Sequence, residues 1–335
     1  MKNLYKIMLY TSMMASTLIV ISSSSWMSMW VGLEINLLSI IPLLSNTKNK
    51  LESEAAMKYF ITQTMASTIF MLAIIIILSN NDMVTPSKYF SMLMDTAILT
   101  KMGAAPFHFW FPEIMEGLTW LNSMMMMTWQ KIAPMMIFMY STKSTTFLTV
   151  IIILSMLISG LMGINQTSMR KILAYSSINH IGWMIGTMLT NQTLWMIYFI
   201  IYSMMTINIT MMFKMMNISF ISQLTNSMNN NKTIKIMFSL NFLSLGGIPP
   251  FIGFFPKWIT INSMIQEKMY LLTLSMTLLT LMTLVFYTQA MLLSGIMISN
   301  ETNLKISNPK QNSWMISNFI TLSLLSTASM MISFT

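Results

Sequence analysis

Long apolar stretches constrain this sequence more than any other feature. Eleven of them approach or exceed the roughly 20 residues that an α-helix needs to cross a membrane. They cover residues 4–22, 25–45, 56–79, 89–108, 121–141, 146–165, 172–189, 192–213, 234–264, 270–297 and 313–334. The segments between them are short. The sequence therefore predicts an all-α membrane protein with about eleven transmembrane helices in a single domain over residues 1–335.

The composition agrees with a protein dissolved mainly in lipid. Only 8% of the 335 residues are charged and 55% are apolar, whereas a soluble domain carries about 25% charged residues. There is no cysteine, which excludes disulfides and cysteine-ligated iron–sulfur clusters. Neither a P-loop nor a dinucleotide-binding glycine motif occurs. We therefore expect no cofactor and no metal in this chain, and no nucleic-acid partner.

Positive charges gather at one side of the predicted membrane. Twelve lie at the side of the N-terminus: Lys2, Lys6, Lys48, Lys50, Lys58, Arg170, Lys171, Lys214, Lys232, Lys235, Lys305 and Lys310. Only Lys88, Lys143 and Lys268 lie at the other side. Basic residues favour the inner side of a membrane. We expect the N-terminus to face the matrix, or the cytoplasm if the protein is bacterial. With an odd number of spans the C-terminus faces the opposite compartment, which is the intermembrane space in the first case.

A ten-residue motif occurs twice. Residues 103–112 read GAAPFHFWFP and residues 247–256 read GIPPFIGFFP, at the end of the fourth stretch and inside the ninth. Five spans separate the copies, so they should have opposite orientations in the membrane, as in the inverted repeats of transporters. The alternative is a chance match between aromatic-rich helix ends. We place repeat one at about 1–141, repeat two at about 146–297 and a final helix at about 313–334.

The motif also predicts two broken helices. Proline cannot continue a helix, so we expect the ninth stretch to form two half-helices around residues 246–253. Broken backbone at membrane depth persists only where protein or water satisfies its polar groups. A hydrated interior is the consequence.

Four ionisable residues lie inside predicted spans as candidates for a proton relay: Glu34, Lys101, Lys131 and Lys257. A charge at the bilayer centre costs about 2.5–3.5 kcal/mol on insertion scales, so these groups should be paired, hydrated or neutral. A buried lysine binds its proton less tightly in apolar surroundings and more tightly beside a carboxylate. A lysine that alternates between the two can load and release a proton.

Structural alternatives exist for these residues. Glu34 could bond to Asn36 or Ser39, Lys101 could extend towards an interface, and Lys257 could lie near the surface.

Other polar residues in the spans have two interpretations as well. Lys131 precedes Pro134 and could be structural. Asp95 stands six residues before Lys101 and does not share its helix face, so we interpret it as a structural or helix-end group. His108 and His180 are possible relay stations because imidazole titrates near neutral pH, or simply hydrogen-bonding histidines.

Four blocks carry a resemblance to a known family: residues 30–44 (WVGLEINLLSIIPLL), 97–113 (AILTKMGAAPFHFWFPE), 165–184 (NQTSMRKILAYSSINHIGWM) and 244–258 (SLGGIPPFIGFFPKW). They resemble the antiporter-like subunits of respiratory complex I and their relatives in multisubunit cation/proton antiporters. The resemblance implies that Glu34 is the motif glutamate and Lys101 its partner. It further implies that Lys131 is the connecting lysine and that Lys257 is the titratable residue near the proton exit.

The resemblance further implies a place in an enzyme complex. The chain would be a proton-translocating membrane-arm subunit of the NADH–ubiquinone oxidoreductase in the mitochondrial inner membrane. NADH, FMN, iron–sulfur clusters and ubiquinone would be bound in the assembled complex, outside this chain. Its partners would be other membrane-arm subunits and lipids, and its substrate the proton. A stand-alone cation/proton antiporter and a purely structural membrane subunit are the alternatives.

Overall fold

A computed structural model describes residues 2–46, 49–79, 88–141, 144–228, 232–249 and 251–296 of the chain. These residues form fourteen helices and no strand, apart from one isolated bridge between Ser168 and Phe220. The chain divides into two compact units, Met1–Leu154 and Ser155–Thr335. The division falls within α8 (Thr145–Ile164).

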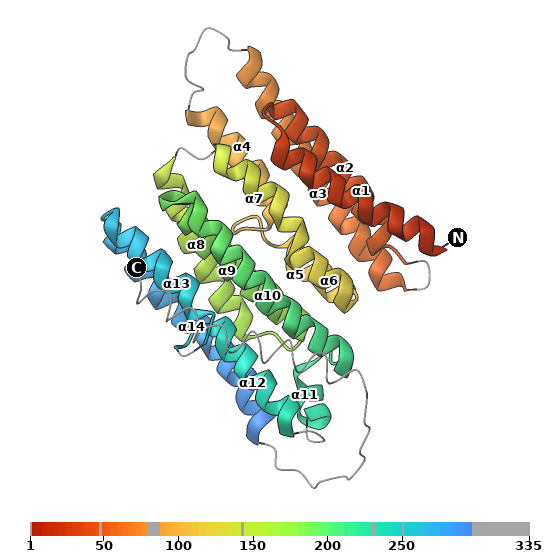
Figure 1. Cartoon of the computed structure of the whole chain (residues 1–335), viewed down its shortest axis with the longest axis vertical. Coiled ribbons are helices and arrows are strands. Elements are labelled where there is room, and N and C mark those ends of the chain that lie inside the picture. Colours follow the sequence, from red (N-terminus) through yellow and green to blue (C-terminus); the bar gives the residue numbers. More distant parts are fainter. Residues whose placement is uncertain are drawn as a thin grey trace. The chain divides into compact units, whose positions relative to one another are not determined.

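The first unit is a bundle of antiparallel helices with two short helices at one end (Figure 1), in which α7 also packs against α1 and α2. α1 packs against α2, α2 against α3, α3 against α4 and α4 against α7. Its helices are α1 (Lys2–Ser22), α2 (Trp26–Leu44), α3 (Lys50–Ser79), α4 (Lys88–Met102), α5 (Trp110–Gly117), α6 (Trp120–Met127) and α7 (Trp129–Ser141).

The second unit is built around α9. Every residue of α9 from 172 to 188 is buried, which is typical of a helix surrounded by others, and α9 packs against α10 and α13. α12 packs against α14. The helices are α9 (Met169–Thr190), α10 (Gln192–Met216), α11 (Ile221–Met228), α12 (Lys232–Gly246), α13 (Phe254–Gln266) and α14 (Tyr270–Ile296).

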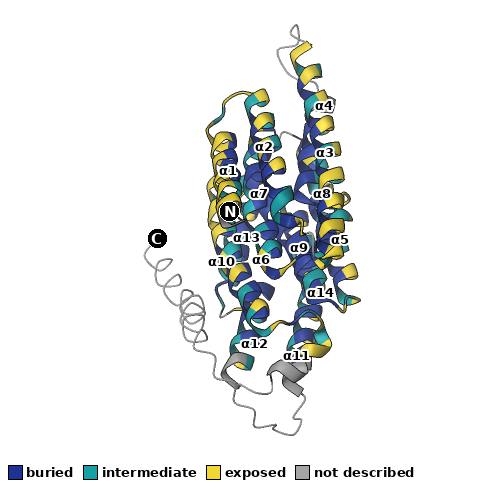
Figure 2. Ribbon diagram, turned by 90° about the vertical axis from the view of Figure 1, so that its right-hand side faces the viewer, coloured by how far each residue is buried: buried dark blue, intermediate teal, exposed yellow. Residues whose placement is uncertain are grey.

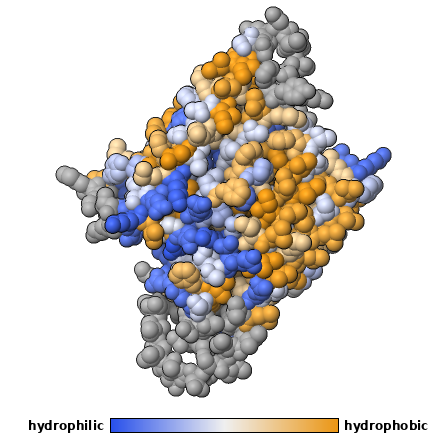
Figure 3. Space-filling model, turned by 180° about the vertical axis from the view of Figure 1, so that it is seen from behind, coloured by the Kyte–Doolittle hydropathy of each residue, from blue (hydrophilic) through white to orange (hydrophobic). Residues whose placement is uncertain are grey.

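The described surface is suited to lipid. Six helices are long and apolar enough to cross a membrane, namely α1, α2, α3, α8, α10 and α14. Large apolar side chains such as Met8, Leu51 and Leu271 are exposed on them. Exposed positions run along α1, α3 and α4 in Figure 2, and Figure 3 shows broad apolar areas beside a hydrophilic area.

A helix or a pair of helices occupies each of the ten predicted stretches up to residue 297. The eleventh, 313–334, lies outside the described residues. One predicted helix is interrupted where we expected continuity: the stretch 121–141 divides at Thr128 into α6 and α7. The stretch 89–108 is helical to Met102, where the first copy of the motif begins and a break was expected. The Thr128 hydroxyl donates to the Met124 carbonyl at 2.8 Å, and such back-bonding bends helices.

The predicted break in the ninth stretch is confirmed. α12 ends at Gly246 and α13 begins at Phe254, so the break lies within the second copy of the motif, whose last three residues begin α13. The first copy likewise separates α4 from α5. Whether the two copies have opposite orientations in the membrane stays a prediction.

Candidate functional site

The two copies of the motif begin with the same turn. Gly103 has φ +75° and Gly247 has φ +76°, in the left-handed region that glycine adopts readily. The N–H of Gly103 bonds to the carbonyl of Leu99 at 3.0 Å, and the N–H of Gly247 bonds to that of Leu243 at 3.1 Å. Such caps end a helix and satisfy its last carbonyl groups. The sequence repeat is therefore a repeat of local structure as well.

Lys101 lies in the last turn of α4, immediately before the first of these turns. Its side chain is only 8% exposed, so the expected alternative of an extended, interfacial lysine is wrong. It lines a cavity of about 20 Å³, which is enough for roughly one water molecule. The other lining residues are Leu33, Asn36, Leu37, Tyr59, Gln63, Gln130 and Pro134.

Two buried amides form part of the wall of this cavity and join α2 to α7. Asn36 Nδ2 donates to Gln130 Oε1 at 3.0 Å, and Gln130 Nε2 donates to Asn36 Oδ1 at 3.2 Å. Gln63 Nε2 donates to the carbonyl of Lys101 at 3.5 Å. Because a buried water needs two to four polar partners, these side chains make the cavity suitable for one.

Glu34 lies on α2 and Lys101 on α4. Among the described residues, no ion pair within 4.0 Å joins the two. Its Oε1 atom is buried and has no hydrogen-bond partner. In the described part of the chain Glu34 has no hydrogen bond to Asn36 or Ser39, because the Asn36 amide donates to Gln130 and the Ser39 hydroxyl donates to the carbonyl of Asn36; whether Glu34 is structural stays a prediction.

Lys131 occupies the first turn of α7, just after the break at Thr128. Its side chain is 2% exposed, and its Nζ atom lies 5.4 Å from the centre of the Phe111 ring. His108 lies in the turn between α4 and α5, where it is buried and its Nδ1 atom is 3.3 Å from the carbonyl oxygen of Pro106. Both residues belong to the first unit, together with Glu34 and Lys101.

Lys257 occupies the first turn of α13 in the second unit. It is 6% exposed, so the expectation that it could lie near the surface is wrong. Its Nζ atom donates to the carbonyl of Gly246 at 2.7 Å. Gly246 is the last residue of α12, and the end of a helix offers free carbonyl groups and a partial negative charge. The Trp183 ring centre is 5.9 Å from Nζ.

His180 lies on α9 in a cluster of aromatic residues. Its Nδ1 atom is 2.9 Å from the hydroxyl of Tyr198, and its ring centre is 4.9 Å from that of Tyr202. Trp183, which contacts Lys257, stands three residues further along α9 and shares the face of His180. The structure thus brings Lys257 to the side of α9 that carries His180.

Sequence reasoning missed most of the neutral polar residues of the site and named Asn36 only as a possible partner of Glu34. Gln63, Gln130, Tyr59 and Tyr198 have no charge, and a search for apolar stretches passes over them. A search for amides and hydroxyls within predicted spans would have found them. It would not have paired Asn36 with Gln130, because these residues are 94 positions apart.

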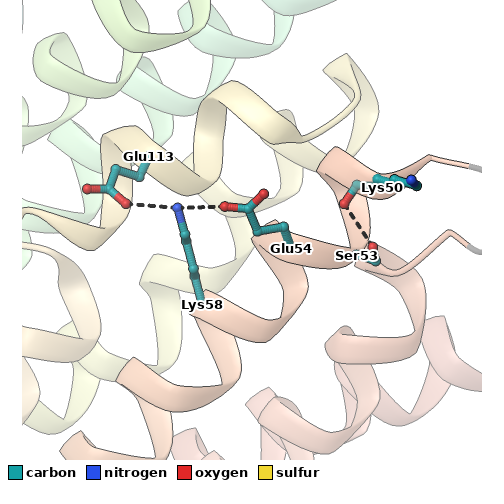
Figure 4. A network of polar contacts seen from close by, with 5 residues as sticks. All are labelled: Lys50, Ser53, Glu54, Lys58 and Glu113. Carbon is teal, nitrogen blue, oxygen red and sulfur yellow. Dashed lines mark hydrogen bonds and ion pairs between the residues drawn. The ribbon is translucent and has the colours of Figure 1, made fainter.

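A separate polar network is exposed. Lys58 on α3 bonds to Glu54 at 3.0 Å and to Glu113 on α5 at 3.1 Å (Figure 4). Ser53 donates to the carbonyl of Lys50 nearby. Exposed ion pairs contribute little to stability, so we regard this network as a solvated surface that connects α3 with α5.

A helical fold with buried lysines beside interrupted helices is typical of membrane proteins that transport ions or protons. The sequence model of the NADH:quinone oxidoreductase/Mrp antiporter transmembrane family matches residues 23–283, and the chain belongs to this family.

Two relatives are named NADH-ubiquinone oxidoreductase chain 2. That of Anopheles gambiae is 46% identical over 94% of this chain and 89% of its own length. That of Locusta migratoria is 45% identical over 94% of this chain and 90% of its own length. The fold resembles a chain of respiratory complex I from Thermus thermophilus with bound aureothin, with a TM-score of 0.85 and 21% identity, over 96% of this chain and 78% of that one. The resemblance expected from the sequence is confirmed.

Proposed function

We propose that this chain is a proton-translocating membrane-arm subunit of a respiratory NADH–ubiquinone oxidoreductase. The observation that supports it best is the burial of Lys101, Lys131 and Lys257, each in the first or last turn of a helix beside a break. Charged groups inside membrane proteins mark ion and proton pathways. The relatives share the name of such an oxidoreductase.

In this proposal Glu34, Lys101, Lys131 and Lys257 pass protons along the interior of the membrane. A proton on Lys101 would be stabilised by a nearby carboxylate on Glu34 and by the C-terminal end of α4. When Glu34 moves away, that stabilisation weakens. The proton then passes through water in the cavity towards Lys131. His108 and His180 are further candidate stations.

The second unit would receive the proton at Lys257. Its bond to the carbonyl of Gly246 holds the ammonium group at the end of α12, and release requires that this bond break. The energy would come from quinone reduction in partner subunits, which would also hold NADH, FMN and the iron–sulfur clusters. We place the chain in the mitochondrial inner membrane with eleven spans in an inverted repeat. Its N-terminus would face the matrix and its C-terminus the intermembrane space.

Replacing Lys257 with methionine tests this function. Methionine has a similar length but no titratable group, so the Lys257→Met complex should assemble and pump fewer protons per electron pair. The matched control is Lys214→Met, since Lys214 belongs to the same unit but is exposed on α10. Proton uptake by proteoliposomes during NADH oxidation measures the ratio. Full pumping by an assembled Lys257→Met complex would favour a structural subunit.

A stand-alone cation/proton antiporter is the second candidate, because the matching family includes Mrp antiporters. Purification in mild detergent separates the two functions. A membrane-arm subunit should copurify with chains that carry flavin and iron–sulfur clusters. A chain that purifies without them and exchanges Na⁺ or K⁺ for protons in vesicles would be an antiporter.

A further inference from the structure

Asp95 is a buried acid that the proposed relay does not use. It lies on α4, the helix that carries Lys101, and its side chain is completely buried. Six residues separate the two, which corresponds to about 9 Å along the helix axis. α4 packs against α7, and the contact of Asp95 is with the last residue of α7, Ser141.

The surroundings of Asp95 provide few groups that could stabilise a negative charge. The Ser141 hydroxyl oxygen is 2.6 Å from Asp95 Oδ1. The other carboxyl oxygen, Oδ2, is buried and has no hydrogen-bond partner. In the part of the chain that the structure describes, no ion pair within 4.0 Å involves Asp95. An ionised carboxylate buried in this way would lack nearly all the compensation that burial requires.

The hydroxyl of Ser141 has one proton and two acceptors in reach. Besides Asp95 Oδ1, the carbonyl oxygen of Phe138 lies 3.1 Å away. If Asp95 is ionised, the serine can donate to only one of them. If Asp95 carries a proton on Oδ1, this proton is donated to Ser141 and the serine proton to Phe138. With a neutral acid, the Asp95 O–H, the Ser141 hydroxyl and the Phe138 carbonyl all form hydrogen bonds. Only the carbonyl-like Oδ2 of Asp95 stays unbonded.

We propose that Asp95 is a further proton-binding site, held as a neutral carboxylic acid, which exchanges its proton with Lys101 during turnover. This inference rests on the proposed function. In the exchange the O–H bond of Asp95 breaks and an N–H bond forms at Lys101 Nζ, which accepts the proton once its own has passed on along the relay. The Ser141 hydroxyl then turns from Phe138 to the new carboxylate. On reloading, these changes reverse and no other bond is altered. Sequence reasoning had favoured a structural role because it could not show how completely Asp95 is buried.

An Asp95→Asn variant separates proton exchange from structure. The amide has the shape of the neutral acid and can donate to Ser141, but it cannot release a proton. We expect the complex to assemble and to lose as much proton pumping per electron pair as Lys257→Met does, with no further loss in the double variant. Wild-type pumping in Asp95→Asn would overturn the inference. If Asp95→Asn pumped like the wild type while Lys257→Met had lost pumping, the proposed function would stand and only the role of Asp95 would be refuted.

Infrared difference spectroscopy gives a second readout that does not need the variant to assemble. The wild-type complex, labelled with ¹³C-aspartate, should show the carbonyl band of a protonated carboxyl that decreases during NADH oxidation. Ser141→Ala should shift this band, because the acid loses its hydrogen-bond acceptor. A carboxyl band that does not change during turnover, or the band of an ionised carboxylate at rest, would contradict the proposal.

Discussion

Gly247 allows Lys257 to be displaced without changing its chemistry. A methyl group at Gly247 would lie 2.8 Å from both Cδ and Nζ of Lys257, so the lysine must move in a Gly247→Ala variant. The bond from Nζ to the carbonyl of Gly246 would then lengthen or break. The titratable group itself would be retained, unlike in Lys257→Met.

The size of the effect follows from the bond that is lost. A hydrogen bond to a charged group contributes about 1.5–3 kcal/mol, and each 1.4 kcal/mol corresponds to about a tenfold change in an equilibrium constant. The population with the ammonium group at the end of α12 should therefore fall by about 10- to 100-fold. Proton transfer through Lys257 should decrease accordingly.

Gly103→Ala is the matched control. It imposes the same backbone strain, because φ at Gly103 is +75°, a conformation that costs a residue with a side chain about 1–3 kcal/mol. Its methyl group would meet Phe111 and Trp110 rather than a lysine. We expect pumping per electron pair in proteoliposomes to fall much further in Gly247→Ala than in Gly103→Ala. Equal pumping by two assembled variants would refute the role of the Gly246 carbonyl.

Two other predictions concern the first unit. Asn36→Ala leaves the amide of Gln130 buried without its partner, at a cost of about 1–3 kcal/mol. The temperature of thermal inactivation should fall in Asn36→Ala. Replacing both Asn36 and Gln130 with leucine should restore much of this temperature, and a double variant as unstable as Asn36→Ala would contradict the pairing. Glu34→Gln removes the carboxylate that the proposed relay pairs with Lys101 while keeping the side chain's shape. Pumping should fall in Glu34→Gln and persist in Glu34→Asp, and equal pumping by both would remove Glu34 from the relay.

The sequence predicted the helical elements well. Helix length and apolarity are local properties, so the ten described stretches were found, and proline and glycine in the second motif predicted the break between Gly246 and Phe254. It did not predict the break at Thr128, because a threonine that bonds to its own helix has no distinct pattern in an apolar stretch. The short helices α5 and α11 were missed as well, since each has only eight residues.

The sequence by itself determined that the solvent of this protein is lipid and that several charged residues lie within its apolar spans. An apolar chain with 8% charged residues must lie in lipid, and lysines within its spans are costly enough to indicate a function. Only the tertiary structure decided what those lysines face. Lys101 lines a cavity with amides from α2 and α7, and Lys257 reaches the end of α12. These contacts depend on packing between distant segments, which local patterns do not specify.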